Sequence, residues 1–299
     1  MISVITCSVS QSAFEKLQQN VAETIGVPFE MIRIDNSDNR YGICEAYNIG
    51  GSKAKYPVFC FVHEDLAFET QDWGAILVRQ LADPDTGLIG IAGGDAKSLV
   101  PSSWSSAVHS NEINLVQYFK SDPGRFLVIR TTGSTEMANG LAPVVALDGV
   151  CLFTKKEVFT RFKFDQLVFP GFHGYDLDYS LQVGTAYKLY VTFEIIIHHF
   201  SEGSPDKKWI RSAINLSKKW KHQLPVSVYQ EGVDYKLHHW KTVQVFMQKL
   251  IELDYHSAVV TYYLFRYSFN RFFSVRRFLS MSKYVTGALL ERFRTPQVS

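Results

Sequence analysis

Apolar and polar positions alternate in blocks along the first part of the chain. Residues 2–7 form a short β-branched apolar run, which predicts a buried strand. Residues 11–25 then place apolar side chains three and four positions apart before a glycine, which predicts a helix. A second strand at 31–34, a helix at 43–55 and a third strand at 56–62 follow. This βαβαβ order is typical of a parallel, doubly wound sheet.

The same periodicities predict the remaining elements. The expected segments are helices at 73–81, 155–162 and 175–186, strands at 87–92, 126–130, 144–147 and 189–198, and a serine-rich loop at 93–111. From residue 206 onward the apolar spacing is mostly helical. The pattern therefore predicts an α/β domain over residues 1–205, followed by a helical region over residues 206–299.

The composition is that of a folded globular protein. The 299 residues are 46% apolar and 20% charged, which excludes a disordered or fibrous chain. The four cysteines form no CxxC pair, which indicates buried free thiols. The first residues lack the basic and apolar regions of a signal peptide, and no stretch reaches the roughly 18 uncharged apolar residues of a spanning helix. We therefore expect a cytoplasmic protein.

Charge is unevenly distributed along the chain. A net charge of +2 is too close to neutral to indicate a nucleic-acid-binding protein. From Tyr262 to the end, however, seven basic residues and one acidic residue are interleaved with many aromatics. A basic, aromatic helix can lie at the inner face of a membrane as a peripheral contact. The alternative is that these aromatics pack on the body of the protein or form a homo-oligomer.

Polar and titratable side chains follow two of the predicted strands. The third strand ends in His63-Glu64-Asp65, and carboxylates at the carboxyl edge of an open sheet can hold a divalent cation. A solvated acidic loop is the alternative there. The second strand is followed by Asp35 and Ser37, whose oxygens can receive hydrogen bonds from a base or a ribose.

Two later segments carry candidate acid–base or metal-binding groups. His173 and Asp176 lie three residues apart beside glycines and aromatics, where they can serve in acid–base chemistry. A carboxylate in the first turn of a helix is also favoured by the helix dipole alone. His198 and His199 end a strongly apolar strand, where histidine is either a metal ligand or a structural residue.

These strand ends together indicate a site for a nucleoside diphosphate and a metal ion. Neither GxxxxGK[ST] nor GxGxxG, the usual phosphate-binding loops, is present in the sequence. The phosphates would therefore be held mostly by the metal and by side chains.

The order and spacing of the motifs resemble family 2 glycosyltransferases with the GT-A fold. Tyr47-Asn48-Ile49-Gly50, followed by the strand that ends at Asp65, resembles the N-x-G and acidic-strand motifs of that family. Asp148-Gly149 resembles its DG strand, Tyr175-Asp176-Leu177-Asp178 its E-D-x-D helix start, and His198 or His199 its late metal-binding histidine. The resemblance covers about residues 1–205 and is closest to the StrF-type glycosyltransferase-like branch.

The resemblance implies a GT-A doubly wound mixed sheet with a helical C-terminal appendage, and a metal-dependent, inverting sugar transfer. The donor would be a nucleotide sugar and the acceptor a glycan or a lipid-linked sugar, with no nucleic-acid partner. Asp176 would be the general base, and Asp65 with His198 or His199 would hold Mn²⁺ or Mg²⁺. The other implied positions are Thr6, Asp35, Ser37, Asn48, Glu64 and Asp65 for donor binding, and Asp148, His173 and Asp178 on the acceptor side. Trp104, in the loop after Gly93-Gly94, is a further candidate for acceptor contact, with ordinary loop packing as the alternative.

The sequence departs from the family pattern at two of these motifs. His63-Glu64-Asp65 replaces the usual D-x-D, which leaves Asp65 as the matched ligand, and Tyr175 stands where the family often has Glu. A non-catalytic protein that binds sugar nucleotides or glycans is therefore the alternative function. A nucleotidyltransferase is disfavoured, because Ser8-Val9-Ser10-Gln11-Ser12 contains neither the Gly nor the Lys of its phosphate loop.

Overall fold

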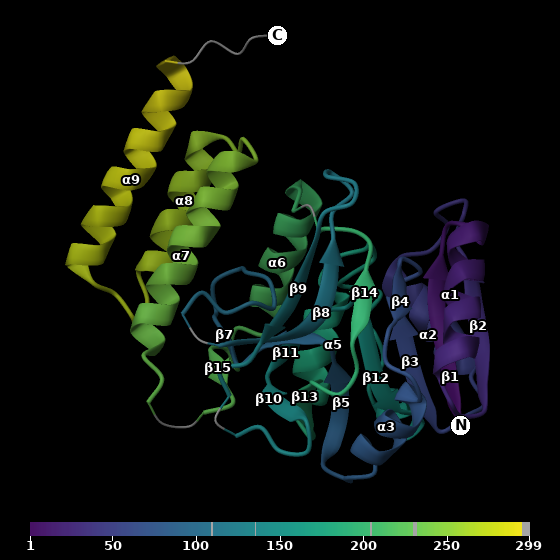
Figure 1. The fold of residues 1–299 in the computed structure, drawn as a ribbon. Coiled ribbons are helices and arrows are strands. Elements are labelled where there is room, and N and C mark those ends of the chain that lie inside the picture. Colours follow the sequence, from purple (N-terminus) through teal and green to yellow (C-terminus); the bar gives the residue numbers. More distant parts are fainter. Residues whose placement is uncertain (109, 135, 204, 230–231, 295–299) are drawn as a thin grey trace.

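The structure is a computed structural model that describes residues 1–108, 110–134, 136–203, 205–229 and 232–294. Figure 1 shows the N-terminal strands at one end of the molecule and the last three helices, side by side, at the other. Within the described residues, a seven-stranded sheet forms the centre. In spatial order its strands are β10 (Leu141–Val144), β13 (Lys188–Thr192), β5 (Thr86–Gly90), β12 (Cys151–Lys155), β3 (Val58–Val62), β1 (Ile2–Ser8) and β2 (Phe29–Asp35).

Parallel pairing of β1 with both β2 and β3 confirms the doubly wound start predicted from the sequence. The sheet is mixed, because β12 runs antiparallel to β3 and β5. Helices cover both faces of this part of the chain. They are α1 (Gln11–Thr24), α2 (Ile43–Lys53), α3 (Trp73–Gln80), α4 (Lys156–Arg161) and α5 (Tyr175–Val183).

The central strand β3 is buried on both faces, which explains its unbroken apolar sequence. Successive side chains of a strand point to opposite faces. Phe59 and Phe61 accordingly pack in one core with residues of α2, α4 and α5, while Cys60 and Val62 pack in the other with residues of α1 and α3. This double burial fixes the register of β3, and with it the positions of the residues that follow.

Smaller sheets stand above the carboxyl edge of the main sheet. One comprises β11 (Ala146–Leu147), β6 (Ala92–Gly94), β8 (Asn111–Tyr118), β14 (Ile197–His199) and β4 (Leu66–Phe68), with β9 (Phe126–Thr131) paired to β8. In the other, β15 (Val226–Ser227) pairs with β7 (Ala96–Lys97). Strands within the segment predicted as a serine-rich loop, and the whole of β8, were not expected from the sequence.

The prediction of one strand over residues 189–198 is wrong. The segment forms β13 in the main sheet and β14 in the second sheet, separated by a bend at Phe193–Ile196. Asn114 of β8 stabilises this bend, because its side-chain amide donates to the carbonyl oxygens of Thr192 and Ile195. The two histidines at the end of β14 therefore belong to a different sheet from residues 188–192 of β13.

The last part of the chain is helical, as its spacing predicts. It comprises α6 (Lys207–Lys219), α7 (Tyr235–Glu252), α8 (Ser257–Ser268) and α9 (Val275–Arg294). Their shared core includes Ile210, Trp240, Phe246 and Leu264, and it also takes in Val100 from the loop after β7. No helix in the described residues combines the length and apolarity needed to cross a membrane.

Candidate active site

A pocket with a volume of about 1360 Å³ lies beyond the carboxyl ends of β1 and β3. Because these strands are parallel, the residues after both reach the same edge. β12 is antiparallel, so the residues before it, Asp148–Val150, come to this edge as well. The pocket is closed by the start of α5, the end of β14, α6 and the loop that carries Ser103 and Trp104.

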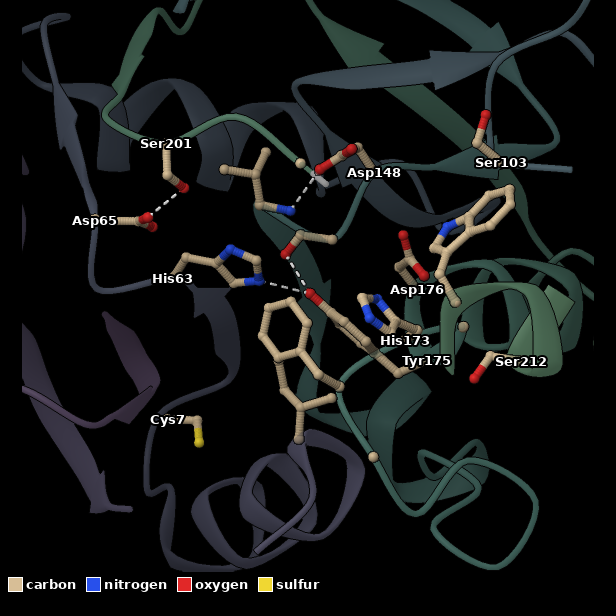
Figure 2. A pocket seen from close by; sticks show the side chains of 18 of the residues that line it. Cys7, His63, Asp65, Ser103, Asp148, His173, Tyr175, Asp176, Ser201 and Ser212 are labelled. Atoms are coloured by element: carbon tan, nitrogen blue, oxygen red, sulfur yellow. Dashed lines mark hydrogen bonds between the residues drawn. The ribbon is translucent and has the colours of Figure 1, made fainter. Parts of the chain in front are cut away.

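His63, Asp65 and His199 form a cluster that could hold a metal ion. One ligand atom from each residue lies within 4.8 Å of the others. The Asp65 carboxylate accepts a hydrogen bond of 2.5 Å from the hydroxyl of Ser201, drawn in Figure 2. Burial opposes ionisation of Asp65, but the Ser201 hydrogen bond and the nearby histidines outweigh it and lower the pKa of this carboxyl. Two imidazoles and one carboxylate are a donor set that can bind a divalent metal ion.

The Tyr175 hydroxyl sets the tautomer of His63. This hydroxyl has one proton, which it donates to the carbonyl oxygen of Gly149 at 2.9 Å. Its 2.8 Å contact with Nε2 of His63 therefore requires that Nε2 carry a proton and donate it. Nδ1 of the neutral ring is then left with a lone pair for a metal. Burial lowers the pKa of His63, which favours this neutral form.

Asp176 forms the acidic group of the opposite wall. Figure 2 shows it with His173 on one side of the pocket, while His63 and Asp65 lie on the other. Burial raises the pKa of Asp176 to about 7, and the carboxylate of Asp148 adds to the effect. A carboxyl that titrates near neutral pH is suited to proton transfer. His173 lines the same wall, with Nε2 at 3.7 Å from the Asp206 carboxylate, and burial lowers its pKa.

Lys97 supports the loop that forms the remaining wall. Its side chain is buried, and Nζ donates to the carbonyl oxygen and the hydroxyl of Ser102 at 3.0 and 2.5 Å. Burial lowers the pKa of Lys97 to about 7. Ser103 and Trp104, which follow directly, line the pocket. Trp104, which was expected on the acceptor side, therefore lines the pocket.

The structure places His198 outside the metal cluster. Nε2 of His198 lies 2.6 Å from the Glu69 carboxylate, and Nδ1 lies 3.2 Å from the Tyr118 hydroxyl. Adjacent residues of a strand point to opposite sides, so only one of the two histidines can face Asp65. That residue is His199, with Nε2 at 3.9 Å from an Asp65 oxygen.

Asp178 lies beneath the pocket and does not line it. Its buried carboxylate accepts hydrogen bonds from Nζ of Lys219, at 2.9 Å, and Nε1 of Trp220, at 2.8 Å. Gln182 donates a third, also at 2.8 Å. The expected acceptor-side role is therefore replaced by a structural one, in which Asp178 joins α5 to the end of α6.

Two predicted donor-binding residues, Thr6 and Asn48, are likewise outside the lining of the main pocket. Thr6 is fully buried inside β1, and its neighbour Cys7 lines the pocket instead. Asn48 is bound to the backbone of Phe164, with its amide donating at 2.8 Å. Glu64 does line the pocket, but its carboxylate accepts from the backbone N–H groups of residues 9 and 10, which anchors the loop after β1.

Asp35 and Ser37 border a smaller depression beside the main pocket. The exposed Asp35 carboxylate accepts from the backbone N–H of Ser37 at 3.0 Å and lies 3.6 Å from the Arg33 guanidinium. Arg40 and Tyr41 line both depressions. Asp35 and Ser37 therefore lie next to the main pocket, at the end of β2.

The sequence analysis named His63 but kept only Asp65 of that motif as the matched ligand, and it missed the roles of Tyr175 and Ser201. The alternation of side chains along an extended chain could have identified His63 as a ligand, because His63 and Asp65 are two residues apart and so point to the same side. Ser201 and His199 are also two residues apart, so their side chains point to the same side as well. Nothing in the sequence alone indicated the hydrogen bond of Tyr175, since it joins residues 112 positions apart.

Replacing Tyr175 with Phe tests the tautomer argument. The variant loses the acceptor for Nε2 of His63, so we expect Mn²⁺ to bind about 10- to 100-fold more weakly in calorimetry. Tyr47→Phe is the matched control, because Tyr47 is also buried, packs against Tyr175 and has a hydroxyl with no hydrogen-bond partner among the described residues. Equal Mn²⁺ affinity of the two variants would contradict the role of Tyr175.

The raised pKa of Asp176 makes stability depend on pH. The folded protein binds this proton up to about pH 7, whereas the unfolded chain releases it near the ordinary value of 3.8. Ionisation of Asp176 therefore destabilises the fold as the pH rises through this range. Asp176→Asn stays neutral, so its Tm relative to wild type should rise between pH 5 and pH 8 in metal-free thermal melts.

Asp165→Asn provides a control of opposite sign for the same melts. Burial raises the pKa of Asp165, but hydrogen bonds from Lys219 and from the backbone outweigh it and lower this pKa. Loss of that carboxylate should reduce Tm at pH 7. A pH-independent difference between Asp176→Asn and wild type would show that the Asp176 carboxyl titrates normally.

Comparison with known proteins places the chain in a family. The model of a family described as "Glycosyltransferase like family" matches residues 3–223. A search of curated proteins finds no match. Among solved structures, the chain is similar to GalNAc-T7 with UDP, GalNAc and Mn²⁺, with a TM-score of 0.53 and 12% identity over 87% of this chain and 54% of that chain. The chain thus spans about half the length of that protein.

Two other solved structures are similar over much of the chain at lower TM-scores. The mannosyltransferase PcManGT from Pyrobaculum calidifontis, in complex with GDP-Man and Mn²⁺, gives a TM-score of 0.44 and 12% identity, with 98% of this chain and 86% of that chain covered. TarS from S. aureus, in complex with UDP-GlcNAc, gives 0.42 and 12%, with 87% and 69% covered. The extent of the family match settles the assignment: the chain belongs to the glycosyltransferase-like family and has the GT-A fold predicted from its sequence.

Proposed function

We propose that the protein transfers a hexosyl group from a nucleoside-diphosphate sugar to a hydroxyl of a glycan or lipid-linked acceptor. Among the glycosyltransferases, we place the protein in family 2, closest to the StrF-type branch. The observation that supports the proposal most is the placement of two different groups in one pocket. A cluster of His63, Asp65 and His199 forms one side, and a carboxyl with a pKa of about 7 forms the other.

The metal cluster would occupy the diphosphate side of the donor. Mn²⁺ or Mg²⁺ held by His63, Asp65 and His199 would neutralise the charge that develops on the leaving diphosphate. Lys120 lies beside the cluster, with Nζ at 3.9 Å from an Asp65 oxygen, and adds a positive charge on the same side. Asp35, Ser37 and the shared wall of Arg40 and Tyr41 would receive the nucleoside, a proposal supported by their position beside the main pocket.

Asp176 would act on the acceptor. Its carboxylate would take the proton of the acceptor hydroxyl while the oxygen bonds to the anomeric carbon of the sugar. The bond from that carbon to the diphosphate breaks in the same displacement, so the nucleoside diphosphate leaves and the configuration inverts. Asp148, His173 and Trp104 line the pocket around Asp176 and would orient the acceptor. General-base assistance of this kind contributes roughly 10²- to 10⁴-fold in rate.

Donor binding and transfer should be lost by different substitutions. Asp65→Ala and His199→Gln should abolish Mn²⁺-dependent stabilisation by UDP or GDP in thermal melts, a stabilisation that reaches about 2.7 kcal/mol at 100 times the Kd. His198→Gln is the matched control and should keep it, since His198 faces away from the cluster. A nucleoside diphosphate that stabilises wild type equally in excess EDTA would contradict the metal assignment.

Asp176→Asn should retain metal-dependent UDP or GDP binding and lose transfer by about 10²- to 10⁴-fold. The measurement is release of nucleoside diphosphate from nucleotide sugars in the presence of an acceptor. Transfer by this variant at the wild-type rate would exclude Asp176 as the base. Donor binding by wild type with no turnover on any acceptor would favour the alternative, a sugar-nucleotide-binding protein without activity.

A further inference from the structure

The C-terminal helices carry exposed aromatic side chains that the proposed function does not use. Tyr262, Phe265, Phe269 and Phe273 are 56%, 49%, 55% and 38% exposed, and we call these four residues the aromatic ridge. The ring centroids of Phe265 and Phe269 are 5.7 Å apart, and those of Phe269 and Phe273 are 4.9 Å apart. The three phenylalanines of the ridge therefore form one continuous apolar strip.

The ridge is the outer face of α8 and of the turn that follows it. Tyr262, Phe265 and Phe269 are spaced three and four residues apart, which places them on one side of a helix. The opposite side, with Val260 and Leu264, is buried in the helical core. Packing of the helices onto one another thus leaves the ridge uncovered, apart from Phe278, whose ring centroid lies 5.2 Å from that of Phe269.

Basic side chains are close to the ridge in sequence, and Arg266 donates a hydrogen bond to the hydroxyl of Tyr262 at 3.2 Å. Arg266, Arg271, Arg276 and Lys283 are all exposed, and no ion pair joins them to a carboxylate within the described part of the chain. The Arg271 guanidinium lies 4.9 Å from the ring centroid of Phe272. From Tyr262 to the end of the sequence there are seven basic residues and one acidic residue. The surface therefore combines an apolar strip with unneutralised positive charge.

We propose that α8 and the start of α9 bind the surface of an anionic lipid bilayer. The phenylalanines of the ridge would enter the boundary between headgroups and acyl chains, and the arginines would contact the anionic headgroups. An aromatic strip flanked by long cationic side chains matches this boundary, where apolar and charged layers lie within a few ångströms of each other. The inference is independent of the reaction proposed for the pocket.

Two other occupants fit the surface less well. A second copy of the chain would bring two strongly basic surfaces together, and like charges without counterions oppose such a contact. A single-stranded nucleic acid would need free ring faces on which to stack its bases. In the ridge, adjacent rings are stacked on each other at interplanar angles of 13° and 18°. Both occupants are outcomes of the test below.

The test is co-sedimentation of the full chain with vesicles of phosphatidylcholine, with and without 30% phosphatidylglycerol. We expect binding to the anionic vesicles alone, and its loss when salt is raised from 0.1 to 0.5 M. Arg266→Gln, Arg271→Gln and Arg276→Gln should each weaken partitioning about fivefold, and the triple variant about 100-fold. Lys16→Gln, Lys55→Gln and Lys218→Gln, on exposed residues elsewhere, form a charge-matched control and should bind like wild type.

Replacing Phe265, Phe269 and Phe273 together with Ser should abolish binding, whereas Leu167→Ser, at an 89% exposed position elsewhere, should not. If the serine variant fails to fold, the arginine series and the salt dependence decide. Equal binding to neutral vesicles, or binding unchanged by the arginine triple variant, would overturn the proposal. The proposal would also be overturned if the wild type does not bind vesicles but forms a dimer or binds an oligonucleotide, and if the variants lose that property. Stabilisation by UDP or GDP with Mn²⁺ should be unchanged in every variant, which separates this test from that of the pocket.

Discussion

The two hydrogen bonds of the Tyr175 hydroxyl hold the candidate site together. They join His63, after β3, to Gly149, before β12, through the first residue of α5. The geometry requires glycine at position 149, because a Cβ there would lie 2.0 Å from the hydroxyl. Asp176 is the next residue in the chain, so the contact that sets the tautomer of His63 also fixes where the acidic wall begins. One buried hydroxyl thereby orients both sides of the pocket.

Much of the fold could be predicted because its central strands are buried on both faces. The apolar run of β3 and the helical spacing of α1 and α2 are direct consequences of covering a parallel sheet from two sides. Prediction failed where buried polar residues interrupt the apolar pattern. β8 contains Glu112 and Asn114, both buried, and Asn114 binds the backbone at the bend between β13 and β14. Such long-range hydrogen bonds leave no periodic signal in either segment.

The candidate site was predicted as a region more accurately than as a set of side chains. Strand ends indicate an edge, and Asp65, Asp148 and Asp176 all line the pocket there. The sequence does not show which of two adjacent polar residues faces inward unless the alternation of the strand is applied, as His198 and His199 illustrate. For Asp178, the motif indicated a functional carboxylate, but the residues that donate hydrogen bonds to it, Lys219 and Trp220, lie at the end of a helix about 40 positions later. Their proximity arises from tertiary packing alone.

The burial of Val100 in the helical core has a mechanical consequence. β7 pairs with β15, the loop after β7 inserts Val100 between the helices, and the next residues of that loop reach Ser103 and Trp104 in the pocket wall. This wall is therefore part of the same cooperative folding unit as α6 and α7. Movement of this wall away from the pocket would have to withdraw Val100 from the helical core. The C-terminal helices, which begin more than 100 residues later in the sequence, thereby hold this wall of the pocket in place.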